Sequence, residues 1–204
     1  MGEYENFLLA RASAIRDLGS DVGLKKLGVR FVRDTAKFNY SYNFDWMGRP
    51  IIQVPQDIMA MQELIWRVKP DLIIETGIAH GGSLAMSASM LALLDYSDAV
   101  SGGTSVDPSK SKRKVLGIDI EIREHNRLAI EQHPMSHLIQ MIQGSSIEPE
   151  IVQEVQKVAK DYQQILVCLD SNHTHDHVIA ELQAYAPLAS LGSYFVVFYT
   201  IIED

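Results

Sequence analysis

The sequence is poor in cysteine, in positive charge and in long apolar runs. Cys168 is the only cysteine among 204 residues, which excludes a disulfide framework and a zinc site built from thiolates, and fits a reducing compartment. The 26 Asp and Glu residues outnumber the 18 Lys and Arg residues, so the net charge of −8 gives no general attraction to nucleic-acid phosphates or anionic lipid. The longest apolar run, residues 194–202, is too short to cross a bilayer. We therefore expect a cytoplasmic protein without a nucleic-acid partner and without membrane insertion.

The chain has the composition of a folded globular protein. Apolar residues make up 47% of it and charged residues 22%. From residue 70 onwards, short apolar runs alternate with segments of helical periodicity. The runs are continuous, which indicates strands buried on both faces of a mostly parallel sheet in an α/β fold. The expected strands cover residues 72–74, 115–118, 138–142, 165–169 and 194–202, and the expected helices begin near residues 82, 122, 147 and 175.

The first 69 residues have a different pattern. Residues 3–18 have a partly apolar helical face, residues 37–55 are irregular and rich in aromatic side chains, and a helix is expected from Pro55 to Pro70. The aromatic side chains either pack on the core or form a lid over a bound substrate. We therefore expect an N-terminal helical extension with an aromatic lid at residues 1–69, and the α/β core at residues 70–204.

A glycine-rich turn follows the first strand of this core and opens a helix, with the sequence Glu75-Thr76-Gly77-Ile78-Ala79-His80-Gly81-Gly82. Ligands of parallel sheets bind beyond the carboxyl ends of the strands, so this turn is a candidate binding site. The spacing of Gly77, Ala79 and Gly82 weakly matches a dinucleotide turn, which places a pyrophosphate at the helix N-terminus.

The same turn also suits S-adenosylmethionine. That cofactor has no phosphate, and its cationic sulfonium and amino group favour a nearby carboxylate such as Glu75, while the small residues Gly77, Ala79 and Gly81 allow close approach of the backbone. Asp119, at the end of the second strand, can accept hydrogen bonds from both ribose hydroxyls of either cofactor. A purely structural turn remains the third interpretation.

Histidines gather after the fourth strand. Asp170, His173 and His177 are spaced i, i+3, i+7, so a helix beginning at Asp170 would place them on one face as an iron or zinc site of an oxygenase or hydrolase. Because Asp170 is expected to end a strand, the helical spacing is expected to fail. His173 then lies in the turn after the strand, where it either takes a proton from a substrate hydroxyl or only bonds the turn backbone.

Several strings together resemble the cephalosporin hydroxylase / rhamnosyl O-methyltransferase family; they lie at residues 42–53, 75–83, 117–120, 144–146 and 169–175. The resemblance covers residues 37–204. It implies the Rossmann-like three-layer fold of class I methyltransferases and S-adenosylmethionine-dependent O-methylation of a sugar hydroxyl, rhamnosyl-like, or of a small natural product. It further implies that Gly77, Gly81 and Ser83 line the methionine portion of the cofactor, that Asp119 holds the ribose and that Ser145 lies near the adenine. Asp170 and His173 are the expected catalytic residues.

Two departures from the family pattern bear on activity. Some members bind Mg²⁺ through the acid that Asp170 matches and through an acid after the fifth strand, where this sequence has Tyr199. A single carboxylate is a poor ligand set for Mg²⁺, so magnesium is a doubtful cofactor here. The sequence also ends shortly after the fifth strand, as if the C-terminal hairpin were truncated. Both departures favour, as an alternative, a degenerate family member that serves binding or assembly. An uncovered strand at residues 194–202 predicts a homo-oligomer.

Overall fold

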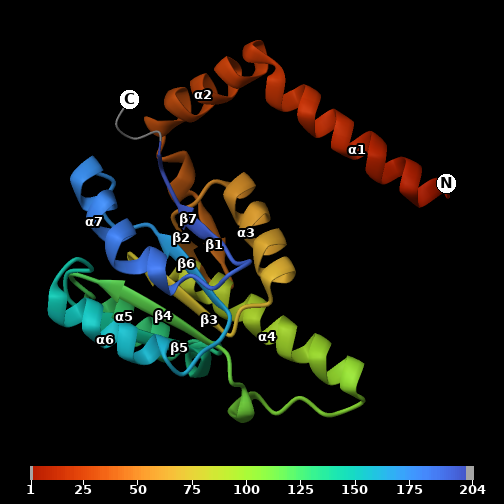
Figure 1. The fold of residues 1–204 in the computed structure, drawn as a ribbon. Helices are drawn as coiled ribbons and strands as arrows, with labels where there is room; N and C mark the ends of the chain where they lie inside the picture. Colours follow the sequence, from red (N-terminus) through yellow and green to blue (C-terminus); the bar gives the residue numbers. More distant parts are fainter. Residues whose placement is uncertain (1, 201–204) are drawn as a thin grey trace. The chain divides into compact units, whose positions relative to one another are not determined.

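The computed structural model describes residues 2–200, and its contacts divide the chain between Ser41 and Tyr42 into two units (Figure 1). The first unit contains helix α1 (Glu3–Ser20) and helix α2 (Val22–Ala36). Helix α1 confirms the helix expected over residues 3–18, whereas α2 has no counterpart among the expected helices. The Asp21 side chain caps α2 by accepting a hydrogen bond of 2.9 Å from the backbone amide of Leu24. No residue of these two helices is buried.

The second unit begins with a short β-hairpin, which the sequence did not predict. Strands β1 (Phe44–Trp46) and β2 (Arg49–Ile51) pair antiparallel, after a 3₁₀ turn at residues 40–42. Met47 and Gly48 join them with φ values of 49° and 81°, a two-residue turn whose twist matches that of the strands. Phe44 and Trp46 pack against a buried cluster, so for these two residues the structure favours packing on the core.

Helix α3 (Pro55–Val68) follows, as expected, and belongs to the second unit by its packing. Its buried face consists of Met61, Ile65 and Val68. The contacts of the structure therefore divide the chain at residue 41, and the functional division at residue 69 stays a prediction.

A five-stranded parallel sheet forms the centre of the second unit, with strand order β5-β4-β3-β6-β7. This confirms the predicted α/β fold with a mostly parallel sheet. The strands are β3 (Leu72–Thr76), β4 (Lys114–Asp119), β5 (Ile139–Gln143), β6 (Ile165–Leu169) and β7 (Phe195–Val197). The helices between them are α4 (Gly82–Gly102), α5 (Glu124–Glu131), α6 (Pro149–Ala159) and α7 (His175–Tyr185), with 3₁₀ turns at 108–110, 136–138 and 186–188.

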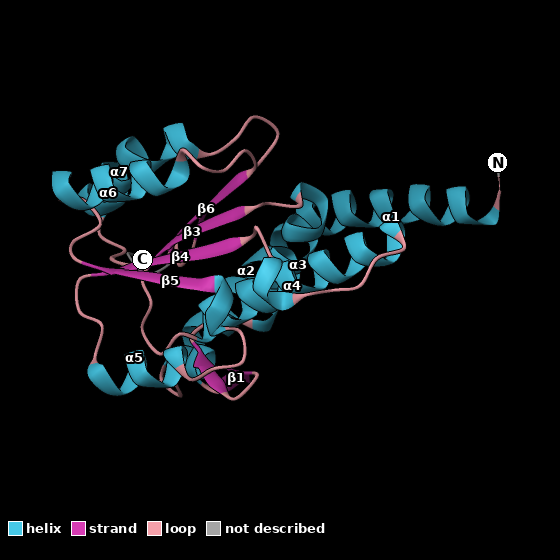
Figure 2. Ribbon diagram, turned by 90° about the horizontal axis from the view of Figure 1, so that it is seen from below, coloured by secondary structure: helices cyan, strands magenta, loops and turns pink. Residues whose placement is uncertain are grey.

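The sheet lies between two helical layers, with α6 and α7 on one face and α3, α4 and α5 on the other (Figure 2). Side chains alternate between the two faces along each strand. Ile73 of β3 and Cys168 of β6 therefore join the cluster on the α4 side, whereas Ile74 and Val167 join the cluster under α6 and α7. The same alternation decides on which face of the sheet each polar residue at a strand end comes to lie.

The last strand is shorter than the sequence predicted. We expected it over residues 194–202, but β7 covers only Phe195–Val197, and residues 201–204 lie outside the described part of the chain. Within that part, β7 lies at the edge of the sheet and pairs with β6 alone. Across residues 2–200, no helix is long and apolar enough to cross a membrane.

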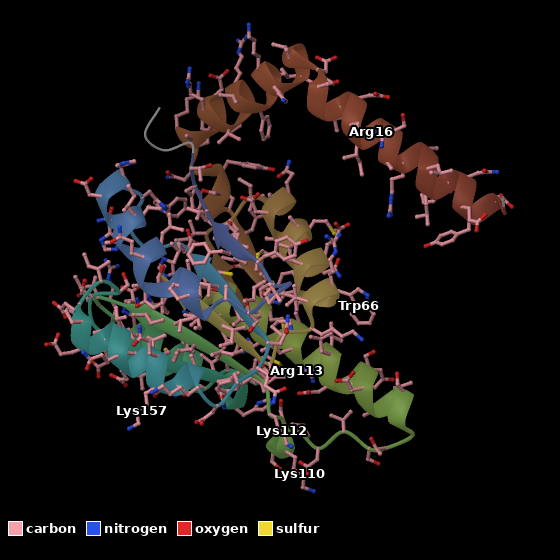
Figure 3. All side chains as sticks on the ribbon, in the orientation of Figure 1. Arg16, Trp66, Lys110, Lys112, Arg113 and Lys157 are labelled. Atoms are coloured by element: carbon pink, nitrogen blue, oxygen red, sulfur yellow. The ribbon has the colours of Figure 1, made fainter. Side chains whose placement is uncertain are left out.

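A charged clamp holds the loop that connects α4 to β4. Arg113, labelled in Figure 3 with Lys110 and Lys112 of the same loop, pairs with Asp95 and lies 2.8 Å from Asp98, both on α4. Because this loop precedes β4, the clamp lies at the amino ends of the strands. It therefore stabilises the end of the sheet opposite to the candidate site.

Candidate functional site

The carboxyl ends of β3, β4 and β6 come together around the glycine-rich turn. The Gly77 amide donates a hydrogen bond of 2.7 Å to the carbonyl of Ile118, at the end of β4. The Asp170 amide donates a bond of 2.9 Å to the carbonyl of Thr76. Residues that lie far apart in the sequence thus share one edge of the sheet, as predicted from the positions of the strand ends.

Gly77 has a conformation and surroundings that only glycine tolerates. Its φ is +90°, and a Cβ atom there would lie 2.1 Å from the carbonyl oxygen of Asp170. Gly82 is equally crowded, because a Cβ atom there would lie 2.2 Å from the carbonyl oxygen of Pro50 in β2. The turn is therefore packed between the hairpin on one side and the end of β6 on the other.

Asp119 holds the glycine-rich turn in place. Its Oδ2 atom accepts hydrogen bonds of 2.8 Å and 3.2 Å from the amides of Ile78 and Ala79, and its Oδ1 atom accepts a bond of 3.1 Å from the amide of Glu121. Ala79 itself has a φ of 45° and is exposed. A carboxylate has about four acceptor sites. Asp119 can therefore organise the turn and still accept a hydroxyl of a ligand.

Glu75 is a buried carboxylate on the α4 face of the sheet, with 2% of its surface exposed. Ser83 of α4 donates a hydrogen bond to its Oε1 atom. Burial raises the pKa of Glu75 to about 7, although the bond from Ser83 acts in the opposite direction. The group therefore changes its charge near neutral pH.

A small cavity adjoins Glu75. Its volume of about 10 Å³ is at the lower limit for holding one water molecule. Almost all of the surface that faces it is apolar; the lining residues are Gln53, Asp57, Ile58, Met61, Glu75, Ser83, Met86 and Phe198. The cavity shows that α3, β3 and α4 leave space beside the carboxylate.

Asp170 lies on the same face as Glu75, directly after β6. Gln53 Nε2 donates a hydrogen bond of 2.8 Å to Asp170 Oδ2. Burial, and then the negative charge of Glu75, raise the pKa of Asp170 well above its ordinary value. The Oε1 atom of Gln53 is buried and has no hydrogen-bond partner among residues 2–200. Sequence reasoning gave Gln53 no role, although it lies in one of the strings that carry the family resemblance.

The structure separates the histidines that were considered as a metal site. Helix α7 begins at His175, so Asp170 and His173 lie in the preceding turn, as the strand assignment predicted. His173 Nε2 lies 3.9 Å from Asp170 Oδ1, and burial lowers the pKa of His173. His177 points elsewhere, with its Nε2 atom 3.4 Å from Glu181 Oε1. Within residues 2–200, no three His, Cys, Asp or Glu side chains are grouped so as to hold a metal ion.

Tyr199 occupies the position where an acid was expected from the family pattern. Its hydroxyl donates a hydrogen bond of 2.5 Å to the carbonyl of Ile52, and its ring centroid lies 5.2 Å from that of His173. The phenol thus binds the backbone next to Gln53. Residues 203 and 204, the other acids near this end of the chain, lie outside the described residues.

The turn after β5 completes the edge. The Gly144 amide donates a hydrogen bond of 2.8 Å to the Asp119 carbonyl, and half-buried Ser145 follows. The next residue, Ser146, is buried and donates a bond of 2.6 Å to Glu181 of α7. The sequence analysis gave Glu181 no role, although its position four residues before Tyr185 could have indicated that it lies on the buried side of the helix.

Comparison with known proteins agrees with this architecture. The family model described as Rhamnosyl O-methyltransferase/CmcI matches residues 38–204. The rhamnosyl O-methyltransferase of Mycobacterium bovis is 28% identical over 153 residues, which cover 74% of this chain and 55% of the relative, and that of Mycobacterium leprae is 27% identical over 153 residues, with 74% and 58% covered. The chain thus spans little more than half the length of these relatives.

A solved structure of CmcI with SAH superposes with a TM-score of 0.51 at 17% identity, covering 79% of this chain and 69% of that chain. At this identity the likeness bears on the fold alone. Together with the parallel sheet and its two helical layers, it establishes the Rossmann-like fold of class I methyltransferases. Because the family model matches most of the sequence, the chain belongs to the rhamnosyl O-methyltransferase/CmcI family.

Proposed function

We propose that this protein is an S-adenosylmethionine-dependent O-methyltransferase whose acceptor is a hydroxyl of a sugar, rhamnosyl-like, or of a small natural product. The observation that carries the proposal is the convergence of Gly77, Asp119 and Asp170 at one edge of the sheet in a chain of this family. The names of the mycobacterial relatives support a sugar acceptor.

The residues at this edge fit the chemistry of the cofactor. Gly77, at a φ of +90°, lets the turn pack directly against the backbone of Asp170, and Glu75 offers a buried carboxylate to a cationic group. Asp119 retains acceptor capacity for one ribose hydroxyl, and Ser145 lies on the neighbouring turn, where the adenine is expected. When bound, S-adenosylmethionine supplies a methyl group that is already activated on a sulfonium.

The protein then has to position the acceptor and remove its proton. His173 is suited to take that proton, because burial lowers its pKa and favours the neutral imidazole at neutral pH. Asp170, with Oδ1 at 3.9 Å from His173 Nε2, stabilises the imidazolium that results when its carboxyl group is ionised, and its raised pKa makes this dependent on pH. Gln53 fixes Asp170 from the other side.

Calorimetry with S-adenosylhomocysteine and with NADH tests the cofactor assignment. We expect binding of the former and none of the latter, and the reverse result would refute the proposal. A methyl-transfer assay with rhamnosides tests the activity. Binding without transfer to any acceptor would favour the alternative, a degenerate member that serves binding or assembly.

The cell compartment and the oligomeric state belong to the same proposal. A cytoplasmic location is supported by Cys168, which is free and buried in β6. A homo-oligomer is supported by β7, whose outer edge has no partner strand within the described residues. Magnesium has less support, because Tyr199 directs its hydroxyl to a backbone carbonyl.

A further inference from the structure

A buried polar network joins two turns of the candidate site through helix α7. Glu181 has no exposed surface, and its Oε1 atom accepts hydrogen bonds of 2.6 Å from Ser146 Oγ and 2.7 Å from Ser171 Oγ. Ser146 follows β5, and Ser171 follows β6. One carboxylate oxygen thus connects the ends of two strands that are not neighbours in the sheet.

Two further side chains of α7 complete the network. Tyr185, one helical turn after Glu181, donates a hydrogen bond of 2.6 Å from its hydroxyl to the carbonyl of Ser146. His177 places its Nε2 atom 3.2 Å from Ser146 Oγ and 3.3 Å from Ser171 Oγ. Each serine hydroxyl has one proton, which it donates to Glu181, so it can only accept from His177. The network therefore requires a hydrogen on His177 Nε2.

The network is costly to maintain as a purely structural feature. Within the described residues, no Lys or Arg pairs with Glu181, and its Oε2 atom is buried without a hydrogen-bond partner. A buried carboxylate lowers stability unless both of its oxygens are paired or hydrogen-bonded, and apolar residues of similar volume are often as stable. The arrangement is better explained by the positions of the two serines.

The two serines are the immediate neighbours of predicted site residues. Ser146 follows Ser145, which is expected near the adenine, and Ser171 follows Asp170, which is expected at the acceptor. We propose that Glu181 is a positioning residue that fixes the turn after β5 relative to the turn after β6 and thereby shapes the cleft for the cofactor. This inference rests on the proposed function and adds a residue to that site.

The test compares Glu181→Leu with the matched control Glu181→Gln. Leucine removes the acceptor at similar volume, whereas glutamine keeps an oxygen that can accept from both serines. For S-adenosylhomocysteine binding measured by calorimetry, we expect at least a tenfold loss of affinity in Glu181→Leu and less than a threefold loss in Glu181→Gln. The thermal unfolding midpoint of both variants is recorded to show that they are folded. Glu154→Gln, on the exposed surface of α6, should change neither quantity.

A second comparison separates positioning from packing. The double variant Ser146→Ala/Ser171→Ala has no serine hydroxyls that could donate to residue 181. Adding Glu181→Leu to it should therefore lower the affinity for S-adenosylhomocysteine by less than a further twofold. If the losses of affinity instead multiply, or if Glu181→Leu binds S-adenosylhomocysteine like the unmodified protein, Glu181 does not position these turns.

If Glu181→Leu does not fold, the serine double variant, measured with and without Glu181→Gln, decides the question. The positioning role predicts a tenfold loss of affinity from the two serine substitutions alone. If the unmodified protein does not bind S-adenosylhomocysteine, the proposed function fails, and the inference about the cofactor cleft fails with it.

Discussion

Replacing Glu75 by glutamine should stabilise the protein at pH 8 and leave its stability at pH 4 almost unchanged. The pKa of Glu75 rises from 4.5 to about 7 on folding, because burial disfavours the charged form. Between these values the native state holds a proton that the unfolded chain has released. The free energy of unfolding therefore falls as the pH rises from about 4.5 to 7, and it stays lower above that range.

The size of the effect follows from the two pKa values. One pH unit corresponds to 1.36 kcal/mol, so a rise of about 2.5 in pKa costs about 3 kcal/mol of stability above pH 7. Glutamine has no proton to lose and can still accept the hydrogen bond from Ser83. The difference in unfolding free energy between Glu75→Gln and the unmodified protein should grow from near zero at pH 4 to about 3 kcal/mol at pH 8. Other acids contribute to the pH profile of both proteins, and the difference between the two profiles reports Glu75 together with the effect of its charge on Asp170.

Urea unfolding followed by circular dichroism between pH 4 and pH 8 measures this difference. The control is Glu63→Gln, an exposed acid on α3, which should leave the pH profile unchanged. A Glu75→Gln variant with the same pH profile as the unmodified protein would refute the description of Glu75 as a buried carboxylate without a compensating charge. The same variant should bind S-adenosylhomocysteine more weakly at pH 8, because it offers no negative charge to the ligand's amino group.

Three further predictions concern the turn, the metal and the assembly. Gly77→Ala should cost more than about 3 kcal/mol in urea unfolding, since it adds strain at φ +90° to a 2.1 Å clash, whereas Gly103→Ala, with open space around it, should cost about 1 kcal/mol. Tyr199→Asp should bind Mg²⁺ more tightly than the unmodified protein or Tyr199→Phe in calorimetric titration, and micromolar affinity of the unmodified protein through Asp170 would contradict our reading of Tyr199. Light scattering at micromolar concentration should give the mass of an oligomer that buries residues 194–202, and a stable monomer would count against it.

The strands and the helices of the core were predictable because their patterns are strong. A run such as Ile165–Leu169 is apolar at every position, and β6 covers the same five residues. The predicted strand ends also indicated that Glu75, Asp119 and Asp170 lie close together, because parallel strands bring their carboxyl ends to one edge of the sheet. The sequence could therefore predict the edge that carries the site.

The hairpin could not be predicted from the same signals. The hairpin depends on Met47 adopting a positive φ, which its side chain disfavours and which packing of β2 against Gly82 supports. Glu181 was also missed, since its role depends on Ser146 and Ser171, which lie 35 and 10 residues away in the sequence. Contacts of this kind arise from tertiary packing and leave no periodic signal.

Three acidic side chains at this edge are largely buried, which is rare for acidic residues. Glu75 and Glu181 are almost completely buried, the Asp170 side chain is 13% exposed, and no Lys or Arg pairs with any of the three within the described residues. A negative charge on one of these groups makes ionisation of another less favourable, since the charge of Glu75 contributes to the raised pKa of Asp170. Stability alone would favour their replacement, and such conflicts with local preference concentrate at functional sites. A bound group that carries positive charge and hydrogen-bond donors relieves this cost, and S-adenosylmethionine has both.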